Sequence, residues 1–260
     1  MFARPAIVCL AALLTAAPSV ADSGVFQQLL DSSVWIVNLD TDTTGSGVVV
    51  DAERRLVITN YHVVGESREV ALFFAAYDSE GRLVTDGGTY AKNFKTLEEG
   101  ELACFGKVVG TWKERDLALV ELDFMPSDVT GVPLSETGAT PGEAVHSVGN
   151  PSASDALWVY SPGSVRQVYR RNAEFSDGQK LNARMVEVTS PINGGDSGSG
   201  MVNSRGELIG IVSWMSHAGR LMSYAIDISE VKALLQSYGM EAPAGTVVAS
   251  NQMATVNWPQ

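Results

Sequence analysis

Short apolar stretches rich in β-branched residues alternate along the chain with polar, glycine-containing turns. Stretches of this kind, bounded by Gly, Asp, Asn or Ser, predict β-strands. The first half contains them at residues 33–38, 45–50, 55–59, 69–75, 102–109 and 117–122, and the second half at 143–148, 156–160, 165–169, 183–188, 201–202, 208–213 and 221–226. Because long helices do not alternate with these strands, we expect an all-β fold made of two small barrels or sandwiches packed together.

Few segments have a helical pattern. Residues 25–30 space their apolar positions like a short helix. Residues 229–238 form the clearest predicted helix, which Ser229 can cap at its N-terminus and Gly239 can end. Turn-forming residues at 126–142 predict a linker between an N-terminal barrel (22–125) and a C-terminal barrel with its helix (143–240), followed by a loose tail at 241–260. The polar stretch 77–100 is too long for an ordinary hairpin loop and predicts either an ordered excursion near a functional site or a mobile flap.

Residues 1–21 have the pattern of a secretory signal peptide. Arg4 provides the basic start, residues 6–17 are apolar but too few to span a bilayer, and Ser19 and Ala21 are the small residues of a cleavage site. We therefore expect cleavage after Ala21 and a secreted protein, which in a bacterium means the periplasm or beyond. No membrane anchor is expected after cleavage, because Cys9 lacks the preceding small residues of a lipoprotein signal.

Charge and cysteine content narrow the classes of partner. The formal net charge is −12, and loss of Arg4 with the signal peptide would make it −13. An acidic surface argues against nucleic acid or an anionic membrane as a partner. Only Cys104 would remain after cleavage, so no intramolecular disulfide is expected. Its place in an apolar strand indicates a small buried hydrophobic residue rather than a nucleophile.

The segment around Ser197 is the strongest candidate for chemistry. An apolar run leads into the turn Gly194-Gly-Asp-Ser-Gly198, and a second apolar run leads away from it. Glycine adopts positive φ and lets another backbone approach closely. Such a turn can expose one hydroxyl and aim several N–H groups at one point, as acyl transfer requires. Taken alone, the segment is also compatible with an ordinary β-turn that contains a serine.

Two further residues favour the catalytic interpretation. His62 follows an apolar strand, and catalytic side chains are often held at the ends of rigid elements. A neutral imidazole can take a proton from serine and return it to a leaving amine. Asp116 directly precedes another apolar strand, where it is either a turn residue or the anion that orients His62. The chain order His, Asp, Ser is that of the chymotrypsin triad.

These residues and their surroundings resemble chymotrypsin-fold serine peptidases, and most of all the HtrA/Deg branch of the trypsin-like peptidases. The matching segments follow one another in the same order over residues 25–238. They are Gly45-Ser-Gly-Val-Val-Val-Asp51, Leu56-Val-Ile-Thr-Asn-Tyr-His-Val-Val64, Lys107-Val-Val-Gly-Thr111, Asp116-Leu-Ala-Leu-Val120, Val148-Gly-Asn-Pro151, Ile192-Asn-Gly-Gly-Asp-Ser-Gly198, Gly206-Glu-Leu-Ile-Gly-Ile211 and Tyr224-Ala-Ile226. The resemblance implies two packed six-stranded antiparallel β-barrels, a short N-terminal helix and a C-terminal helix.

The resemblance also implies roles for individual residues. His62 would be the general base, Asp116 its orienting partner and Ser197 the nucleophile. Backbone N–H groups of the loop would form the oxyanion hole, at Gly195, Asp196 and Ser197. The substrate would meet the residues of the specificity pocket and its backbone-pairing strand, which are Pro191, Ser213, Trp214, Met215 and Met222. Since Pro191 replaces an acidic pocket base and the methionines add apolar surface, we expect a small or medium apolar P1 residue.

The remaining histidines do not alter this assignment. His146 lies inside a strand and is interpreted as a barrel residue with its hydrogen-bonding needs met by neighbours. His217 and Arg220 are interpreted as solvated loop residues; the alternative is that they favour an acidic group of the substrate. The histidines lack metal-ligand spacing, so no metal or other cofactor is expected. The expected partner is a protein or peptide substrate, and oligomerisation is left open.

Two departures from HtrA-type chains keep other functions in view. Asp196 stands where they usually have Asn, and no site for the N-terminal activation of trypsin-like zymogens is present to supply its partner. No PDZ domain is expected after residue 240, so peptide-gated regulation is not implied. The leading hypothesis is a secreted serine endopeptidase that acts through an acyl-enzyme. The alternatives are a peptidase-fold binding or scaffold protein with little turnover and an esterase that uses the same triad.

Overall fold

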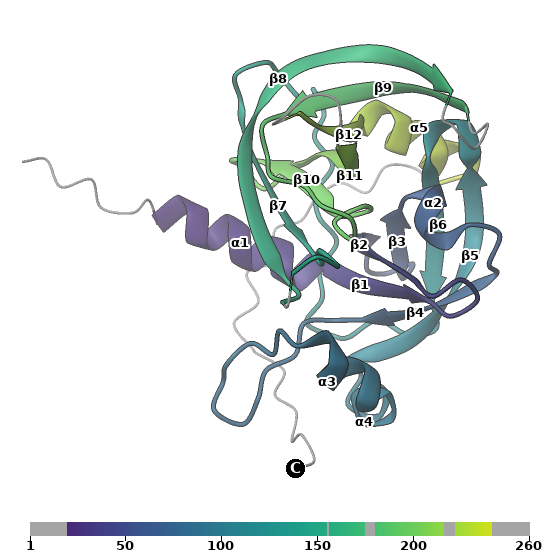
Figure 1. Cartoon of the computed structure of the whole chain (residues 1–260), viewed down its shortest axis with the longest axis vertical. Coiled ribbons are helices and arrows are strands. Elements are labelled where there is room, and N and C mark those ends of the chain that lie inside the picture. Colours follow the sequence, from purple (N-terminus) through teal and green to yellow (C-terminus); the bar gives the residue numbers. More distant parts are fainter. Residues whose placement is uncertain (1–19, 155, 175–179, 216–221, 241–260) are drawn as a thin grey trace, which may run out of the picture.

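The computed structural model describes residues 20–154, 156–174, 180–215 and 222–240. Within them, twelve strands close into two antiparallel six-stranded barrels, which confirms the predicted fold (Figure 1). The first barrel contains β1 (Ser33–Asn38), β2 (Thr43–Asp51), β3 (Leu56–Thr59), β4 (Glu69–Phe73), β5 (Ala103–Trp112) and β6 (Leu117–Leu122). The second contains β7 (Ala144–Gly149), β8 (Val159–Glu174), β9 (Lys180–Val188), β10 (Gly200–Asn203), β11 (Leu208–Met215) and β12 (Ser223–Asp227).

Both barrels close by hydrogen bonding between strands that are distant in sequence. The spatial order is β1-β2-β3-β6-β5-β4 in the first barrel and β10-β11-β12-β9-β8-β7 in the second. The first closes where β1 pairs with β4, and the second where β10 pairs with β7. Closure leaves no unpaired sheet edge and gives the loops a rigid support.

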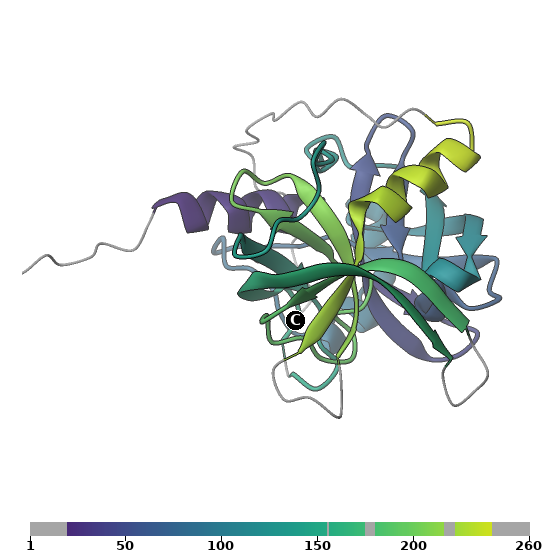
Figure 2. The ribbon, with the colours of Figure 1, turned by 90° about the horizontal axis from the view of Figure 1, so that it is seen from above.

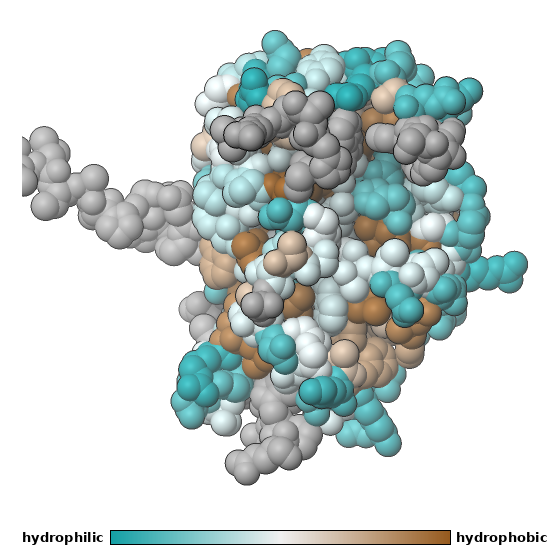
Figure 3. Space-filling view, in the orientation of Figure 1, coloured by the Kyte–Doolittle hydropathy of each residue, from teal (hydrophilic) through white to brown (hydrophobic). Residues whose placement is uncertain are grey.

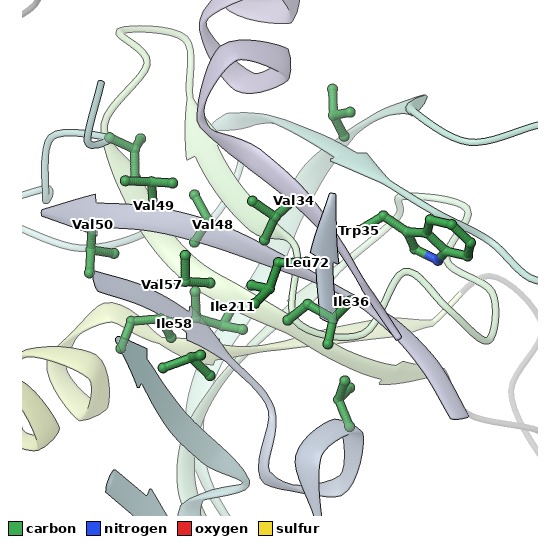
Figure 4. Packing of buried hydrophobic residues seen from close by; sticks show 14 of the residues in the cluster. Val34, Trp35, Ile36, Val48, Val49, Val50, Val57, Ile58, Leu72 and Ile211 are labelled. Carbon is green, nitrogen blue, oxygen red and sulfur yellow. The ribbon is translucent and has the colours of Figure 1, made fainter. Parts of the chain in front are cut away.

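β-Branched and other aliphatic side chains fill the core. Figure 4 shows Val34 and Ile36 of β1, Val48 of β2, Ile58 of β3 and Leu72 of β4 packed together with residues of neighbouring strands. All five are fully buried, and one cluster of buried apolar residues joins members of both barrels. Fully burying such a side chain contributes about 1.5–3 kcal/mol each. The two barrels therefore share a packed boundary, and the loops that meet there are held from both sides.

Two sequence predictions are corrected in the second barrel. The predicted strands 156–160 and 165–169 belong to one strand, β8, because Pro162 and Gly163 pair with β7 instead of forming a turn. A register shift between Val165 and Gln167 lets β8 bend from β7 onto β9. The other predicted strands are present, with ends that differ by a few residues.

Two long helices lie outside the barrels (Figure 2). α1 (Val20–Ser32) is longer than the predicted helix and packs on the second barrel, where the Phe26 ring meets Tyr160 edge-on at 5.8 Å. α5 (Ile228–Ser237) matches the predicted C-terminal helix, but its cap is Asp227, which accepts the N–H and hydroxyl of Ser229. The predicted stop is confirmed, since Gly239 has φ +71° and donates to the carbonyl of Gln236.

The excursion at residues 77–100 is an ordered structure with two short helices, α3 (Gly87–Lys92) and α4 (Phe94–Glu99). Both lie beside β4, at the lower end of the molecule in Figure 1. Tyr90 and Leu97 of these helices are fully buried, so the ordered alternative holds for this segment. Elsewhere on the face drawn in Figure 3, hydrophilic and intermediate residues predominate and hydrophobic ones form smaller groups.

Candidate active site

Asp116 and His62 meet where the loops of the first barrel face the second. His62 lies in α2 (Tyr61–Val64), the single helical turn that follows β3. Asp116 ends the 3-10 turn η1 (Lys113–Arg115) in the left-handed conformation, with φ 54° and ψ 44°. Both carboxylate oxygens of Asp116 lie 2.9 Å from His62 Nδ1, and Oδ1 also accepts the backbone N–H of His62 at 3.0 Å.

The carboxylate of Asp116 has partners from both barrels. Ser213 Oγ of β11 donates to Asp116 Oδ2 at 2.7 Å, and Asn60 Nδ2 donates to the Asp116 backbone carbonyl at 2.9 Å. The residue is 5% exposed. These bonds compensate the left-handed backbone, which costs about 1–2 kcal/mol in a residue other than glycine. Asp116 is therefore fixed as an acceptor on the Nδ1 side of His62.

The pKa of His62 lies above its usual value of 6.5. The largest single effect is desolvation of the ring, which lowers the pKa, but the charge of Asp116 and the hydrogen bond to it raise the pKa by more in combination. The side chain is nevertheless 40% exposed to solvent. With Asp116 accepting at Nδ1–H, the neutral tautomer leaves Nε2 as the acceptor, which is the form a general base needs.

Ser197 lies in the loop between β9 and β10 and is 9% exposed. Its hydroxyl donates to the backbone carbonyl of Ser213 at 2.7 Å. No hydrogen bond joins Ser197 to His62 within the described part of the chain. Ser213 thus contacts two members of the predicted triad, Asp116 through its hydroxyl and Ser197 through its carbonyl.

Of the three predicted oxyanion donors, the Asp196 N–H donates to the Asn193 carbonyl at 3.2 Å. The other two, Gly195 and Ser197, belong to peptide groups whose carbonyls accept hydrogen bonds from serines. Ser152 donates to the Gly194 carbonyl through its N–H at 2.8 Å and its hydroxyl at 2.9 Å. Ser199 donates to the Asp196 carbonyl in the same two ways, at 3.0 and 2.7 Å. In a trans peptide the N–H points opposite to the carbonyl. The N–H groups of Gly195 and Ser197 are therefore both directed away from these serines.

The loop conformation depends on glycine at Gly195 and Gly198. Their φ angles are +96° and +93°, which glycine alone adopts without strain. A Cβ on Gly195 would lie 2.3 Å from the Asn150 carbonyl oxygen, and one on Gly198 would lie 2.0 Å from that of Ser46. The flanking glycines of the sequence motif are thus explained by close backbone contacts with both barrels.

Ser46 of β2 holds the loop from the first barrel. Its N–H donates to the Ser197 carbonyl at 2.8 Å, and its hydroxyl donates to the Gly195 carbonyl at 2.8 Å. The hydroxyl also accepts from the N–H and Nδ2 of Asn150 at 3.0 and 3.1 Å. The sequence interpretation assigned no role to these residues, although both lie in the motif segments 45–51 and 148–151. Their contacts became visible only in the folded structure.

Asp196, which stands where HtrA-type chains usually have Asn, is buried without a cationic partner among the described residues. It is 4% exposed, and its Oδ2 accepts the N–H of Asn193 at 2.8 Å. Its Oδ1 has no hydrogen-bond partner in the described structure and lies against Gly149. Burial raises its pKa to about 6, and the bond from Asn193 opposes that rise. The loop is thus ordered around an uncompensated carboxyl group.

Comparison with known proteins identifies the family of the chain. Residues 45–211 match the trypsin-like peptidase domain. The chain belongs to this family. A relative described as "Serine protease HtrA-like" from Staphylococcus aureus (strain USA300) is 28% identical over 214 residues, which cover 79% of this chain and 25% of the relative. The chain thus spans about a quarter of the length of the curated relatives that it matches.

Solved structures share the fold at low sequence identity. The active form of the Rv3671c protease from M. tuberculosis has a TM-score of 0.66 and 18% identity, with 98% of both chains covered. The serine endoprotease from Yersinia pestis has a TM-score of 0.60 and 19% identity, with 85% of this chain and 67% of that one covered. Deg5 has a TM-score of 0.58 and 21% identity over 85% of this chain and 96% of that one.

The predicted substrate-contacting residues of this trypsin-like peptidase domain are only partly brought together. Pro191 is exposed, Ser213 is buried beside Asp116 and Ser197, and Met222 is partly buried against the core. Trp214 and Met215 contribute backbone to β11, and their side chains lie outside the described parts. His217 and Arg220 also lie outside the described residues.

Two residues that the sequence assigned to the interior are found there. His146 stacks on Tyr160, and its Nδ1 lies 2.6 Å from the tyrosine hydroxyl. Cys104 is buried, and burial raises the pKa of its thiol to about 12. No group of three His, Cys, Asp or Glu residues is arranged for a metal ion in the described segments. Within the same segments, no helix is both long and apolar enough to cross a bilayer.

Proposed function

We propose that the protein is a serine endopeptidase in which Ser197 is the nucleophile, His62 the general base and Asp116 the residue that orients and stabilises the histidine. The observation that carries the proposal is the junction at Ser213, which contacts both Asp116 and Ser197 beside the loop that would supply the oxyanion donors. Family membership supports peptide-bond chemistry at this junction. The site residues themselves are our assignment.

The reaction would follow the pattern of serine acyl transfer. His62 Nε2 takes the proton of the Ser197 hydroxyl while Oγ attacks the scissile carbonyl. The N–H groups of Gly195 and Ser197 receive the oxyanion, and the imidazolium is stabilised by Asp116. His62 then gives the proton to the leaving amine as the peptide C–N bond breaks. Water, deprotonated by the same histidine, hydrolyses the acyl-enzyme and restores Ser197.

The resting position of Ser197 adds a step before attack. Its hydroxyl is bonded to the Ser213 carbonyl, so it must rotate about χ1 to reach His62. The predicted pairing of substrate backbone with β11 would bring a peptide N–H to the same carbonyl. We infer that this competition releases the serine, since a carbonyl engaged by substrate is a poorer acceptor for the hydroxyl.

The substrate preference that we propose is a small or medium apolar P1 residue. Pro191 at the expected pocket base carries no charge, and Met222 adds apolar surface at the expected wall. A panel of internally quenched peptides that differ only at P1 tests this. We expect higher kcat/KM for Ala, Val or Leu than for Arg, Lys or Glu. A preference for a charged residue would contradict the assigned pocket.

A fluorophosphonate probe tests the catalytic assignment directly. We expect the wild-type protein to be labelled at Ser197 and to cleave peptides, while Ser197→Ala does neither. The His62→Ala variant retains the hydroxyl but lacks the base, so it should label at least about 100-fold more slowly. Equal labelling of wild type and Ser197→Ala would refute the proposed nucleophile.

A binding or scaffold function is the alternative, and the hydrogen bond from Ser197 to Ser213 favours it because the triad is not assembled at rest. Under this alternative, substrate peptides bind with the same affinity to wild type and Ser197→Ala and are not cleaved. Paired ester and amide substrates separate an esterase from a peptidase.

We further propose that the protein is secreted through the signal peptide at residues 1–21. N-terminal sequencing of the exported protein tests this, and we expect Asp22 to be the first residue.

A further inference from the structure

The excursion at residues 77–100 joins the two barrels next to the loop at residues 194–199, which is called the oxyanion loop below. Aromatic rings from the first barrel, Trp35 and Phe73, pack edge-on against Tyr90 with ring centres 6.3 and 6.0 Å apart. Trp158, from the segment before β8, also packs edge-on against Tyr90 with ring centres 6.0 Å apart. A cleft of about 340 Å³ lies between the excursion and this segment, with Ser152 in its wall. Ser152 is the residue that holds the Gly194 carbonyl.

The hydroxyl of Tyr90 is a buried hydrogen-bonding centre. It accepts the Ala76 N–H at 2.9 Å and the Trp158 Nε1–H at 3.1 Å, and it donates to the Val84 carbonyl at 3.0 Å. Tyr90 is fully buried, and burial raises its pKa to about 12, so the phenol remains a donor at neutral pH. A hydroxyl with its donor and acceptor capacity used in this way orients the groups around it.

Trp158 connects this centre to the active-site loop. It is buried and has φ +62°, a conformation that is strained for a bulky residue and persists only where the surroundings impose it. Its indole is held by Tyr90, and its backbone N–H donates to Asn150 Oδ1 at 3.1 Å. Asn150 in turn donates from N–H and Nδ2 to Ser46 Oγ, which donates to the Gly195 carbonyl.

These bonds form a continuous buried path in the order Tyr90, Trp158, Asn150, Ser46 and Gly195. We propose that Tyr90, through Trp158 and Asn150, is a positioning residue for the oxyanion loop, and that Ser46 is the group through which it acts. The expected effect of Tyr90 on kcat rests on the proposed function, because it requires peptidase activity at Ser197. The structural consequence, a loop at 194–199 that is ordered by the excursion, holds independently of turnover.

The path explains why a long excursion should be ordered beside a peptidase site. An oxyanion donor acts only when its N–H is already aimed at the developing charge, and losing one typically lowers turnover by about 10²–10³-fold. Glycine has a wide range of backbone dihedral angles because it lacks a side chain. The orientation of the Gly195 N–H therefore depends on the hydrogen bonds to the neighbouring carbonyls. Ser152 holds the carbonyl before it and Ser46 holds its own. The excursion fixes the segment that carries Ser152 and the amide that supports Ser46.

A double-mutant cycle tests the path. Tyr90→Phe removes the hydroxyl and keeps the ring, and Ser46→Ala removes the hydroxyl that reaches Gly195. We expect kcat to fall about 5-fold in Tyr90→Phe, the size of one typical net hydrogen bond, and at least about 10-fold in Ser46→Ala, with KM changed less than 2-fold in each. Because both act through the same bond, we expect the double variant to match Ser46→Ala alone.

Tyr169→Phe is the matched control. This variant also removes one tyrosine hydroxyl and keeps the ring. The Tyr169 hydroxyl is partly buried and donates to Glu187 Oε2 at 2.9 Å on the β8–β9 pair, away from the path. We expect it to retain wild-type kcat. Effects of Tyr90→Phe and Ser46→Ala that multiply in the double variant, or a Tyr90→Phe effect equal to that of Tyr169→Phe, would overturn the proposal.

Amide hydrogen exchange supplies a readout that does not require turnover. We expect faster exchange at residues 194–199 in Tyr90→Phe and in Ser46→Ala than in wild type or Tyr169→Phe. Unchanged exchange in that segment refutes the positioning role even if activity falls. A protein that shows the exchange difference and has no peptidase activity would contradict the proposed function while leaving the positioning role supported.

Discussion

The buried carboxyl group of Asp196 should make the stability of the folded protein depend on pH. Burial raises its pKa from the usual value of 3.8 to about 6 in the folded protein. The folded state therefore binds this proton more tightly than the unfolded state does. Binding of this proton therefore stabilises the folded protein. This stabilisation is complete below pH 3.8 and is lost as the pH rises to about 6.

The size of the effect follows from the same shift. One pKa unit corresponds to 1.36 kcal/mol, so an ionised Asp196 destabilises the fold by about 3 kcal/mol above pH 7. The Asp196→Asn variant has no charge and nearly the same shape, and its carbonyl oxygen can still accept the Asn193 N–H. Its amide group lacks a partner at the Oδ1 position, but that penalty does not change with pH.

Urea unfolding measured from pH 3 to pH 8 provides the assay. We expect the free energy of unfolding of Asp196→Asn, relative to wild type, to increase by about 3 kcal/mol over that range, with most of the change between pH 4 and pH 6. Glu98→Gln removes an exposed carboxylate and serves as the charge control. A difference between Asp196→Asn and wild type that does not vary with pH would refute the buried, uncompensated carboxyl group.

Further predictions concern the triad, the loop and the thiol. The pH profile of kcat/KM should rise through a pKa above 6.5, since the neutral form of His62 is the base; Asp116→Asn should move that inflection to lower pH and reduce kcat by about 10⁴, and an unmoved inflection would contradict the coupling. Gly198→Ala should destabilise the fold by at least about 2 kcal/mol, because its Cβ would lie 2.0 Å from the Ser46 carbonyl oxygen. Gly239→Ala, also at positive φ but with open space around it, should cost only about 1 kcal/mol in the same urea experiment. Cys104 should not react with a thiol reagent at pH 8 until the chain is unfolded, and rapid labelling of the native protein would contradict its burial.

The sequence alone determined most of the secondary structure and the identity of the candidate residues. Strands such as β1 and β6 were predicted to the residue because each is a continuous apolar run between polar turns, and burial of such a run is a local property. The closed barrels and the meeting of His62 with Asp116 were predicted through the ordered motifs of the family resemblance. These patterns are short in range, so the sequence alone contains them.

Local patterns were ambiguous where one stretch of sequence is compatible with two structures. Two separate strands were predicted at 156–160 and 165–169, yet Pro162 and Gly163 between them pair with β7 and the strand continues through them. Ser229 and Asp227 are both good helix caps, and only the end of β12 decided that Asp227 takes the position. The stretch 77–100 was predicted either as ordered or as mobile, because the aromatic partners of Tyr90 come from other parts of the chain.

The tertiary structure alone decided how the candidate active site is held. The bonds from Ser46 to Gly195 and from Ser213 to Asp116 join residues that are 149 and 97 positions apart. The resting bond of Ser197 to Ser213 and the burial of Asp196 without a cation likewise depend on how the loops meet between the barrels. Contacts of this range follow from the packing of two closed barrels and have no periodic signal in the sequence. The sequence therefore named the candidate triad, Asp116 included, but not the hydrogen bonds from Ser46 and Ser213 that hold the site.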